Sequence, residues 1–229
     1  MTRLLVHVEG QTEESFVGQL LRPHLIGGFG YTDVSARLLG NSRQRSRRGG
    51  ARSWTAVRQD IVRHLRQDPN ARSTTMVDFY GMPQTGDRAW PGRAEANAVP
   101  FDQKAAVVQV AIADDIAAEV DGSKGRFLPY VVMHEYEGLL FSDPERFAEA
   151  IGSRDSAGEF RAIRSAFHTP EEINDSPLTA PSKRVESLFP GYQKPLMGTI
   201  AAQRIGLGPI RAECPYFDKW VESLELWGL

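Results

Sequence analysis

Four acidic residues stand at the carboxyl ends of three apolar, strand-like runs. They are Glu9, Asp78, Glu135 and Glu137. In open α/β sheets ligands gather at the carboxyl ends of the strands, so these side chains are expected to meet at one edge. Carboxylates that converge repel one another unless a cation neutralises them, and their hard oxygen atoms suit Mg²⁺ or Mn²⁺. We therefore predict that Glu9 is a metal ligand or a general base.

Glu13 belongs to the same prediction, because its spacing from Glu9 in the stretch VEGQTEESF places it over the same edge. Any one of these acids also has a simpler interpretation, as a solvated loop residue or a helix cap. Glu14 is expected to be such a residue, a partner of a helix dipole, with Thr12 as the N-cap of that helix. The coincidence across three strands favours a shared metal site that contains Glu9, Glu13, Asp78, Glu135 and Glu137.

Positive charge gathers in a different part of the chain, although the whole chain carries a net charge of only −2. The arginines concerned are Arg43, Arg45, Arg47, Arg48 and Arg52. Arginine grips phosphate oxygens well, so this segment is predicted to bind the backbone of DNA or RNA in a salt-dependent way. The alternative is a solvated surface loop. His134 is expected to be a structural residue satisfied by hydrogen bonds, with a ligand or a proton shuttle as the alternative, and Cys214 is expected to be a core or an incidental residue.

The order of predicted elements is strand and helix in alternation, which is typical of a mostly parallel α/β sheet flanked by helices. Strands are predicted at 4–8, 34–39, 74–79 and 128–133, and helices after Thr12, from Trp54 and over 103–120. Shorter helices are expected at 144–151, 160–167, 195–205 and 216–226. The chain then divides into an α/β core, 1–142, and a helical C-terminal region packed on it, 143–229.

Bulk properties set the expected setting of the protein. The 229 residues include one cysteine, which excludes an internal disulfide and suits a reducing compartment. No apolar stretch approaches the length of a membrane span, and no signal peptide is evident, so a cytoplasmic protein without a membrane partner is expected. The sequence leaves both a monomer and a homodimer open.

Several stretches resemble known families. The segment VEGQTEESF resembles the first motif of Toprim domains, the metal-binding fold of topoisomerases, primases and overcoming-lysogenization-defect nucleases. Nearly the whole chain resembles the DUF4276 family through VEGQTEESFV, TTMVDFYGMP, HEYEGLLFSDP and IGLGPIRAECPYFDKW. The resemblance implies a Toprim-like fold. It also implies that Glu9 acts in acid/base chemistry or metal binding, and that Asp78 is the first acid of an Asp-x-Asp metal motif. Tyr80 replaces the second acid.

The Toprim resemblance implies a nuclease that uses one or two Mg²⁺ or Mn²⁺ ions. It also implies a lysine that stabilises the transition state, for which Lys183 and Lys194 are candidates, with Lys194 preferred as the catalytic one; Arg184 is a further cation of this region. The chain has no Gly-x-x-x-x-Gly-Lys-Ser/Thr loop, so the resemblance implies a separate ABC/AAA-type ATPase, in phage defence or DNA repair. The alternative is a catalytically inactive nucleic-acid-binding or regulatory subunit, which the replacement by Tyr80 favours.

Overall fold

The computed structural model describes residues 2–39, 52–174, 176 and 178–229. Its centre is a five-stranded sheet with the order β2-β1-β3-β4, in which β5 also pairs with β3. The strands are β1 (Thr2–Val8), β2 (Tyr31–Leu38), β3 (Ala71–Asp78), β4 (Phe127–Leu128) and β5 (Val131–Val132). Every pairing is parallel. The predicted mostly parallel α/β sheet is therefore confirmed.

Alternation of side chains explains why β1 sits at the centre of the sheet. Leu4, Val6 and Val8 are buried in the core on one face. His7 points to the opposite face, where its ring lies 5.9 Å from that of His64. Both faces of this strand are therefore covered, as is usual for a strand inside a parallel sheet.

The last predicted strand, 128–133, is interrupted, so its prediction as one continuous strand is wrong. Pro129 has no N–H group to give to the ladder and separates β4 from β5. The side chain of Thr75 bridges the gap: its Oγ1 donates to the carbonyl of Tyr130 at 2.8 Å and accepts from the Tyr130 N–H at 2.9 Å. A side chain thus replaces the missing backbone bonds.

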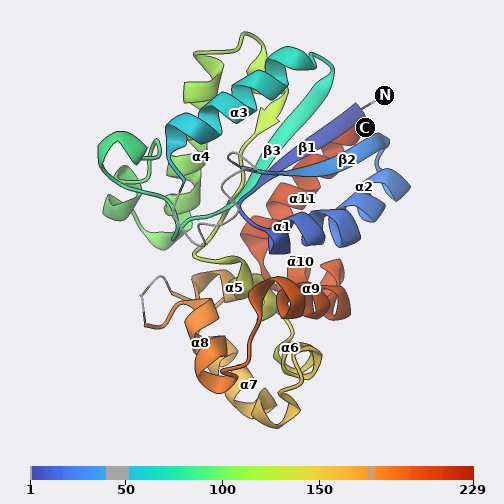
Figure 1. Cartoon of the computed structure of the whole chain (residues 1–229), viewed down its shortest axis with the longest axis vertical. Helices are drawn as coiled ribbons and strands as arrows, with labels where there is room; N and C mark the ends of the chain where they lie inside the picture. Colours follow the sequence, from blue (N-terminus) through green and yellow to red (C-terminus); the bar gives the residue numbers. More distant parts are fainter. Residues whose placement is uncertain (1, 40–51, 175, 177) are drawn as a thin grey trace.

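Helices cover both faces of the sheet (Figure 1). One face carries a continuous first helix and the C-terminal helix. These are α1 (Gln11–Phe16), the π-helical turn η1 (Val17–Leu21), α2 (Arg22–Gly28) and α11 (Pro215–Gly228). The other face carries α3 (Trp54–Gln67) and α4 (Phe101–Ala117). Each set encloses its own apolar core.

This arrangement reverses the direction of winding at β1. The chain leaves β1 toward β2 on one side, and then crosses back through α3 to β3 on the other side. The connections that leave β1 and β3 consequently run over opposite faces. Such a reversal opens a crevice at the carboxyl ends of the two strands, which is where open α/β sheets bind ligands.

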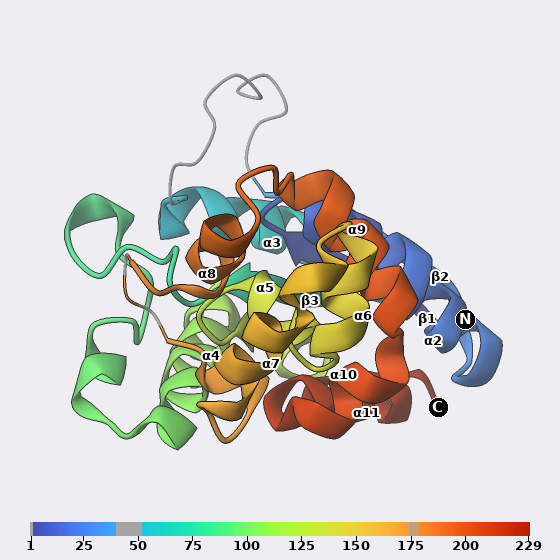
Figure 2. The same cartoon turned by 90° about the horizontal axis from the view of Figure 1, so that it is seen from below.

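The remaining helices lie across that end of the sheet, as the two views show (Figures 1 and 2). They are α5 (Tyr136–Leu140), α6 (Pro144–Ala150), α7 (Ala157–Ser165), α8 (Pro181–Leu188), α9 (Lys194–Ile205) and α10 (Leu207–Glu213). Short 3₁₀ turns are η3 (Gly86–Arg88), η4 (Glu95–Ala98), η5 (Ser123–Gly125), η6 (Arg154–Ser156) and η7 (Pro170–Glu172). Among the described residues, no helix is both long enough and apolar enough to cross a bilayer.

The C-terminal helices share an apolar core with the sheet. Phe16 of α1 contacts Tyr136 of α5 and Phe217 of α11 edge to face. Trp220 of α11 stacks on Tyr130 at 4.3 Å and donates its Nε1–H to Thr74 Oγ1 of β3. Cys214 lies in the same core, as predicted. The division of the chain at 142/143 stays a prediction.

Candidate functional site

Glu9 and Asp78 leave neighbouring strands side by side. In the β1–β3 ladder Val8 pairs with Met76, so the first residue after β1 and the last residue of β3 reach the same edge. The Glu9 carboxylate accepts a hydrogen bond from the backbone N–H of Asp78. It also lies against the turn that follows β3, because a methyl group added at Gly81 would be 3.5 Å from Glu9 Oε2. The structure therefore brings these two predicted residues together.

Glu13 joins them from the first turn of α1. The N-cap of this helix is Gly10, whose carbonyl accepts from Glu14 N–H at 3.1 Å, so the predicted N-cap at Thr12 is wrong. The buried Glu13 carboxylate accepts hydrogen bonds from the N–H groups of Gly10 and of Glu13 itself, as the third helical residue does in a capping box. A Cβ at Gly10 would be 2.9 Å from Glu13 Oε2, so the glycine leaves room for this carboxylate.

Glu137 and Lys194 reach the same edge from α5 and α9. Glu137 is fully buried, and its Oε2 lies 2.8 Å from Lys194 Nζ. Its other oxygen accepts from the Tyr192 hydroxyl at 3.4 Å. The positive charge of Lys194 also lowers the pKa of Glu9, Glu13 and Asp78, which places this ammonium among all four carboxylates. We call Glu9, Glu13, Asp78 and Glu137 the acid cluster.

The Glu135 carboxylate is bound by α8, although the sequence predicted it as a ligand alongside Glu137, and its charge still acts on Glu137 and Lys194. Its Oε2 accepts from the backbone N–H of Ser182, in the first turn of α8, at 2.9 Å. The separation begins at His134, whose φ of 63° is left-handed and therefore turns the chain sharply at the end of β5. The buried ring of His134 donates from Nδ1 to the carbonyl of Ile173 at 2.7 Å, which confirms its predicted structural role.

The other predicted cations lie outside the cluster or outside the described residues. Lys183 pairs with Glu186 at 2.7 Å, and the Arg184 guanidinium lies over the Phe167 ring. Within the basic segment, the predicted nucleic-acid ligands Arg43, Arg45, Arg47 and Arg48 lie outside the described residues. Arg52 is described, and its charge lowers the pKa of Glu9, so this end of the segment lies near the acid cluster.

The electrostatics of the cluster follow from burial and from crowding of like charges. Burial, and then repulsion from Glu13, raise the pKa of Glu9 to about 7. Burial also raises the pKa of Asp78 well above its usual range; Lys194 opposes this shift, and Glu9 and the other acids add to it. The pKa values of Glu13 and Glu137 are raised by burial as well. Burial lowers the pKa of Lys194, but Glu137 and Asp78 outweigh it and raise this pKa overall.

This donor set fits one kind of metal site better than another. Within the described part of the chain, no three His, Cys, Asp or Glu side chains are placed to enclose a metal ion together. The described residues therefore do not form a closed protein cage around a metal ion. Mg²⁺ usually needs only one or two carboxylates, and takes its remaining ligands from water and substrate phosphates. Burial and repulsion from neighbouring acids raise the pKa of both Glu9 and Asp78, so a cation would stabilise their charged forms. These two carboxylates therefore fit a site in which water and substrate complete the coordination of Mg²⁺.

Two features of the site were missed by sequence reasoning. The backbone N–H of Tyr136 donates to Asp78 Oδ1 at 3.1 Å, which orients the carboxylate toward α5. The hydroxyl of Tyr192 approaches Glu137 from the segment before α9. Neither has a signal in the sequence, because both depend on how the C-terminal helices pack. Tyr80, two residues after Asp78, is 36% exposed.

Comparisons with known proteins place the chain in a family. No match was found among curated proteins, and none among solved structures. A family model described as a domain of unknown function, DUF4276, matches residues 8–225. The match covers nearly the full length and includes every residue of the acid cluster and Lys194, so the chain belongs to the DUF4276 family.

Proposed function

We propose that this protein is a Toprim-like, metal-dependent nuclease that hydrolyses phosphodiester bonds in DNA or RNA. One observation carries the proposal: four carboxylates and an ammonium group from β1, α1, β3, α5 and α9 meet at the point where the winding of the sheet reverses. Crowded, desolvated acids in a ligand-binding crevice are a common property of catalytic sites. The Toprim resemblance of VEGQTEESF supports the same class.

Each residue of the cluster has a role in this proposal. Asp78 and Glu9 would hold Mg²⁺ or Mn²⁺, which when bound polarises the phosphate and lowers the pKa of water. In the alternative role Glu9 is the general base and not a ligand, because its pKa in the metal-free protein is about 7, which suits it to take a proton from an attacking water. Lys194, half-exposed and next to these acids, is placed to stabilise negative charge that develops on the phosphate. Arg52 and the preceding arginines would bind the neighbouring phosphates.

The setting of the enzyme is part of the proposal. The chain lacks a nucleotide-binding loop of the Gly-x-x-x-x-Gly-Lys-Ser/Thr type, so we propose a separate ABC/AAA-type ATPase partner. A cytoplasmic role in phage defence or DNA repair fits such a pair.

Nicking of supercoiled plasmid and cleavage of labelled RNA test the activity. Wild-type protein with Mg²⁺ or Mn²⁺ is expected to cut one of them, and EDTA is expected to stop it. Asp78→Asn should reduce the rate at least about 100-fold, because loss of metal-based charge stabilisation costs several kcal/mol. Asp155→Asn is the matched control, since it makes the same replacement at an exposed residue of η6. Equal activity of D78N and wild type would refute the proposal.

A catalytically inactive binding or regulatory subunit is the second candidate. Tyr80 in place of the motif acid and the ion pair between Lys194 and Glu137 favour it, since both reduce the number of free ligands. Thermal unfolding with Mn²⁺ separates the candidates. A rise in the melting temperature that Glu9→Ala abolishes, without turnover of either nucleic acid, would establish the second. The same rise with turnover would establish the first.

A further inference from the structure

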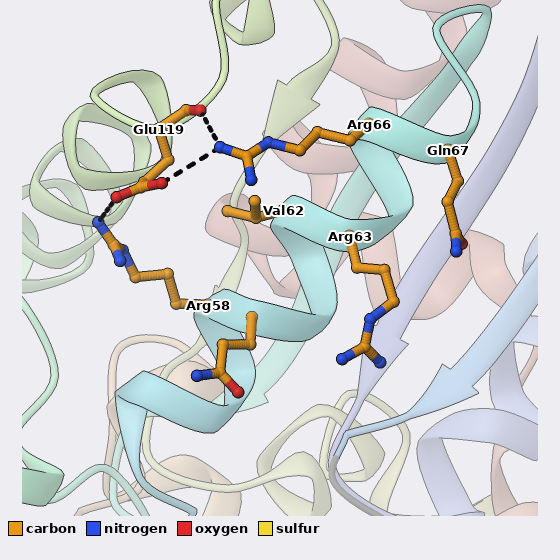
Figure 3. A pocket seen from close by; sticks show the side chains of 7 residues that line it. Arg58, Val62, Arg63, Arg66, Gln67 and Glu119 are labelled. Carbon is orange, nitrogen blue, oxygen red and sulfur yellow. Dashed lines mark hydrogen bonds and ion pairs between the residues drawn. The ribbon is translucent and has the colours of Figure 1, made fainter.

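A further group of arginines lies on α3 (Figure 3). A pocket of about 380 Å³ opens there between α3 and the end of α4. Its lining includes Arg58, Gln59, Val62, Arg63, Arg66 and Glu119. We call it the α3 pocket. Three of its lining side chains are positive and one is negative, and two further acids beside the pocket, Asp115 and Asp60, pair with Arg58 and Arg63.

Two of the arginines are fixed in place by acids at the end of α4. Arg58 donates from Nε to Asp115 at 2.7 Å and from Nη2 to Glu119 Oε1 at 2.8 Å. Arg66 donates from Nη2 to the carbonyl of Glu119 at 2.8 Å. A guanidinium has five N–H donors, so each of these groups keeps donors for a ligand after its protein bonds are made. Fixing the groups in advance reduces the entropy lost on binding.

Of the three arginines, Arg63 makes the weakest contact with an acid of the protein. Its side chain is 55% exposed, and its ion pair with Asp60 is long, at 3.5 Å. Figure 3 shows it on the other side of the helix from the Arg58–Glu119–Arg66 bridge. An exposed pair of this kind contributes little to stability. The charge of Arg63 is therefore available to a partner, and its replacement should leave the fold intact.

The position of the α3 pocket relates it to the acid cluster. Helix α3 begins two residues after Arg52, whose charge acts on Glu9, and runs away from that edge. Arg58 and Arg66 are eight residues apart, which is about 12 Å along the helix axis. One strand of a duplex carries a phosphate every 3.4 Å or so, hence three to four phosphates over that length.

We infer that the α3 pocket binds the phosphate backbone of a nucleic acid that continues from the acid cluster along α3. The identity of the ligand as nucleic acid rests on the proposed function. The contacts are to phosphate oxygens, so they add affinity and position the strand without reading its sequence. Arg63 supplies the exposed charge, while Arg58 and Arg66 supply fixed donors.

Binding of fluorescently labelled 20-base-pair DNA and of the matching RNA duplex, measured by anisotropy in EDTA, tests the inference. Arg63→Glu is expected to weaken binding at least about tenfold, as loss of one charge-assisted contact does. It should also reduce the slope of log K against log salt by about 1. Arg63→Lys should retain most of the affinity. The matched control is Arg161→Glu, an equal charge change at a 61% exposed arginine of α7, at the far end of the molecule.

Unchanged binding by R63E, with melting temperatures equal to wild type, would overturn the inference. An equal loss in R161E would also overturn it, because total charge would then explain the effect. The catalytic proposal fails separately: Asp78→Asn is expected to bind like wild type in EDTA. If R63E weakens binding as expected but the wild-type protein has no nuclease activity, the inference about the α3 pocket is supported and only the proposed catalytic activity is refuted.

Discussion

Glu171, which is buried, and Glu9, which is half-buried, are two glutamates with the same shifted pKa and different surroundings. Burial raises the pKa of each to about 7. The Glu171 carboxylate accepts one backbone N–H at each oxygen, from Tyr216 and Phe217 at 2.9 Å, at the start of α11. Glu9 instead shares its surroundings with three further acids and Lys194.

The difference separates a structural acid from a candidate functional one. At Glu171 burial is offset by hydrogen bonds to helix N–H groups that would otherwise lack partners. At the acid cluster, repulsion between the acids adds to the unfavourable free energy of burying their charges. The single ammonium group of Lys194 does not neutralise four carboxylates. Proteins keep such unfavourable groups together mainly where function requires them. A raised pKa alone therefore does not identify the site, whereas convergence of like charges does.

The largest effect is expected from Glu171→Ala. Two buried N–H groups lose their acceptor, and each unsatisfied group costs about 1–3 kcal/mol, so the free energy of unfolding should fall by roughly 3 kcal/mol. Urea unfolding measures it. Glu171→Gln retains one acceptor oxygen and should lose less. A change below 1 kcal/mol in E171A would show that α11 does not depend on this carboxylate.

A smaller effect of opposite sign is expected from Glu9→Gln. The amide keeps an oxygen for the Asp78 N–H and removes one negative charge from the acid cluster. The free energy of unfolding at pH 8 should rise by about 1–2 kcal/mol, as it does when strained functional groups are replaced. Urea unfolding of E9Q beside E171Q makes the comparison directly. Destabilisation of both variants would mean that the two acids are equivalent.

The smallest expected effect is the change in the free energy of unfolding per pH unit. Both acids have a folded pKa near 7 and an ordinary value of 4.5, so the unfolded chain releases these protons first as the pH rises. This contribution to stability is present below pH 4.5 and is lost as the pH rises through 7. Each group accounts for at most about 1.4 kcal/mol per pH unit. The decline between pH 5 and 7.5 should be shallower in E9Q and in E171Q, and an unchanged decline would contradict the shifted values.

The sequence was sufficient for the first three strands and for the meeting of Glu9 with Asp78, because both follow from local apolar runs and from the geometry of parallel strands, but not for the break at Pro129. It was not sufficient to choose between Glu135 and Glu137. That choice depends on the left-handed backbone of His134, a conformation that is uncommon for residues other than glycine and that no local pattern indicates. Lys194 could not be separated from Lys183, since its position depends on how α9 packs against α1.

The π-helical turn η1 has a consequence for the rim of the sheet. A wider turn changes the rotational phase of a helix, so the residues before and after it need not share the usual 3.6-residue period. The first half of this helix can therefore present Glu13 to the polar rim, while the second half keeps Leu25 against apolar neighbours. The helix thus stays continuous while its two halves face different surroundings. The extra residue in the π-helical turn provides the change of direction without a loop.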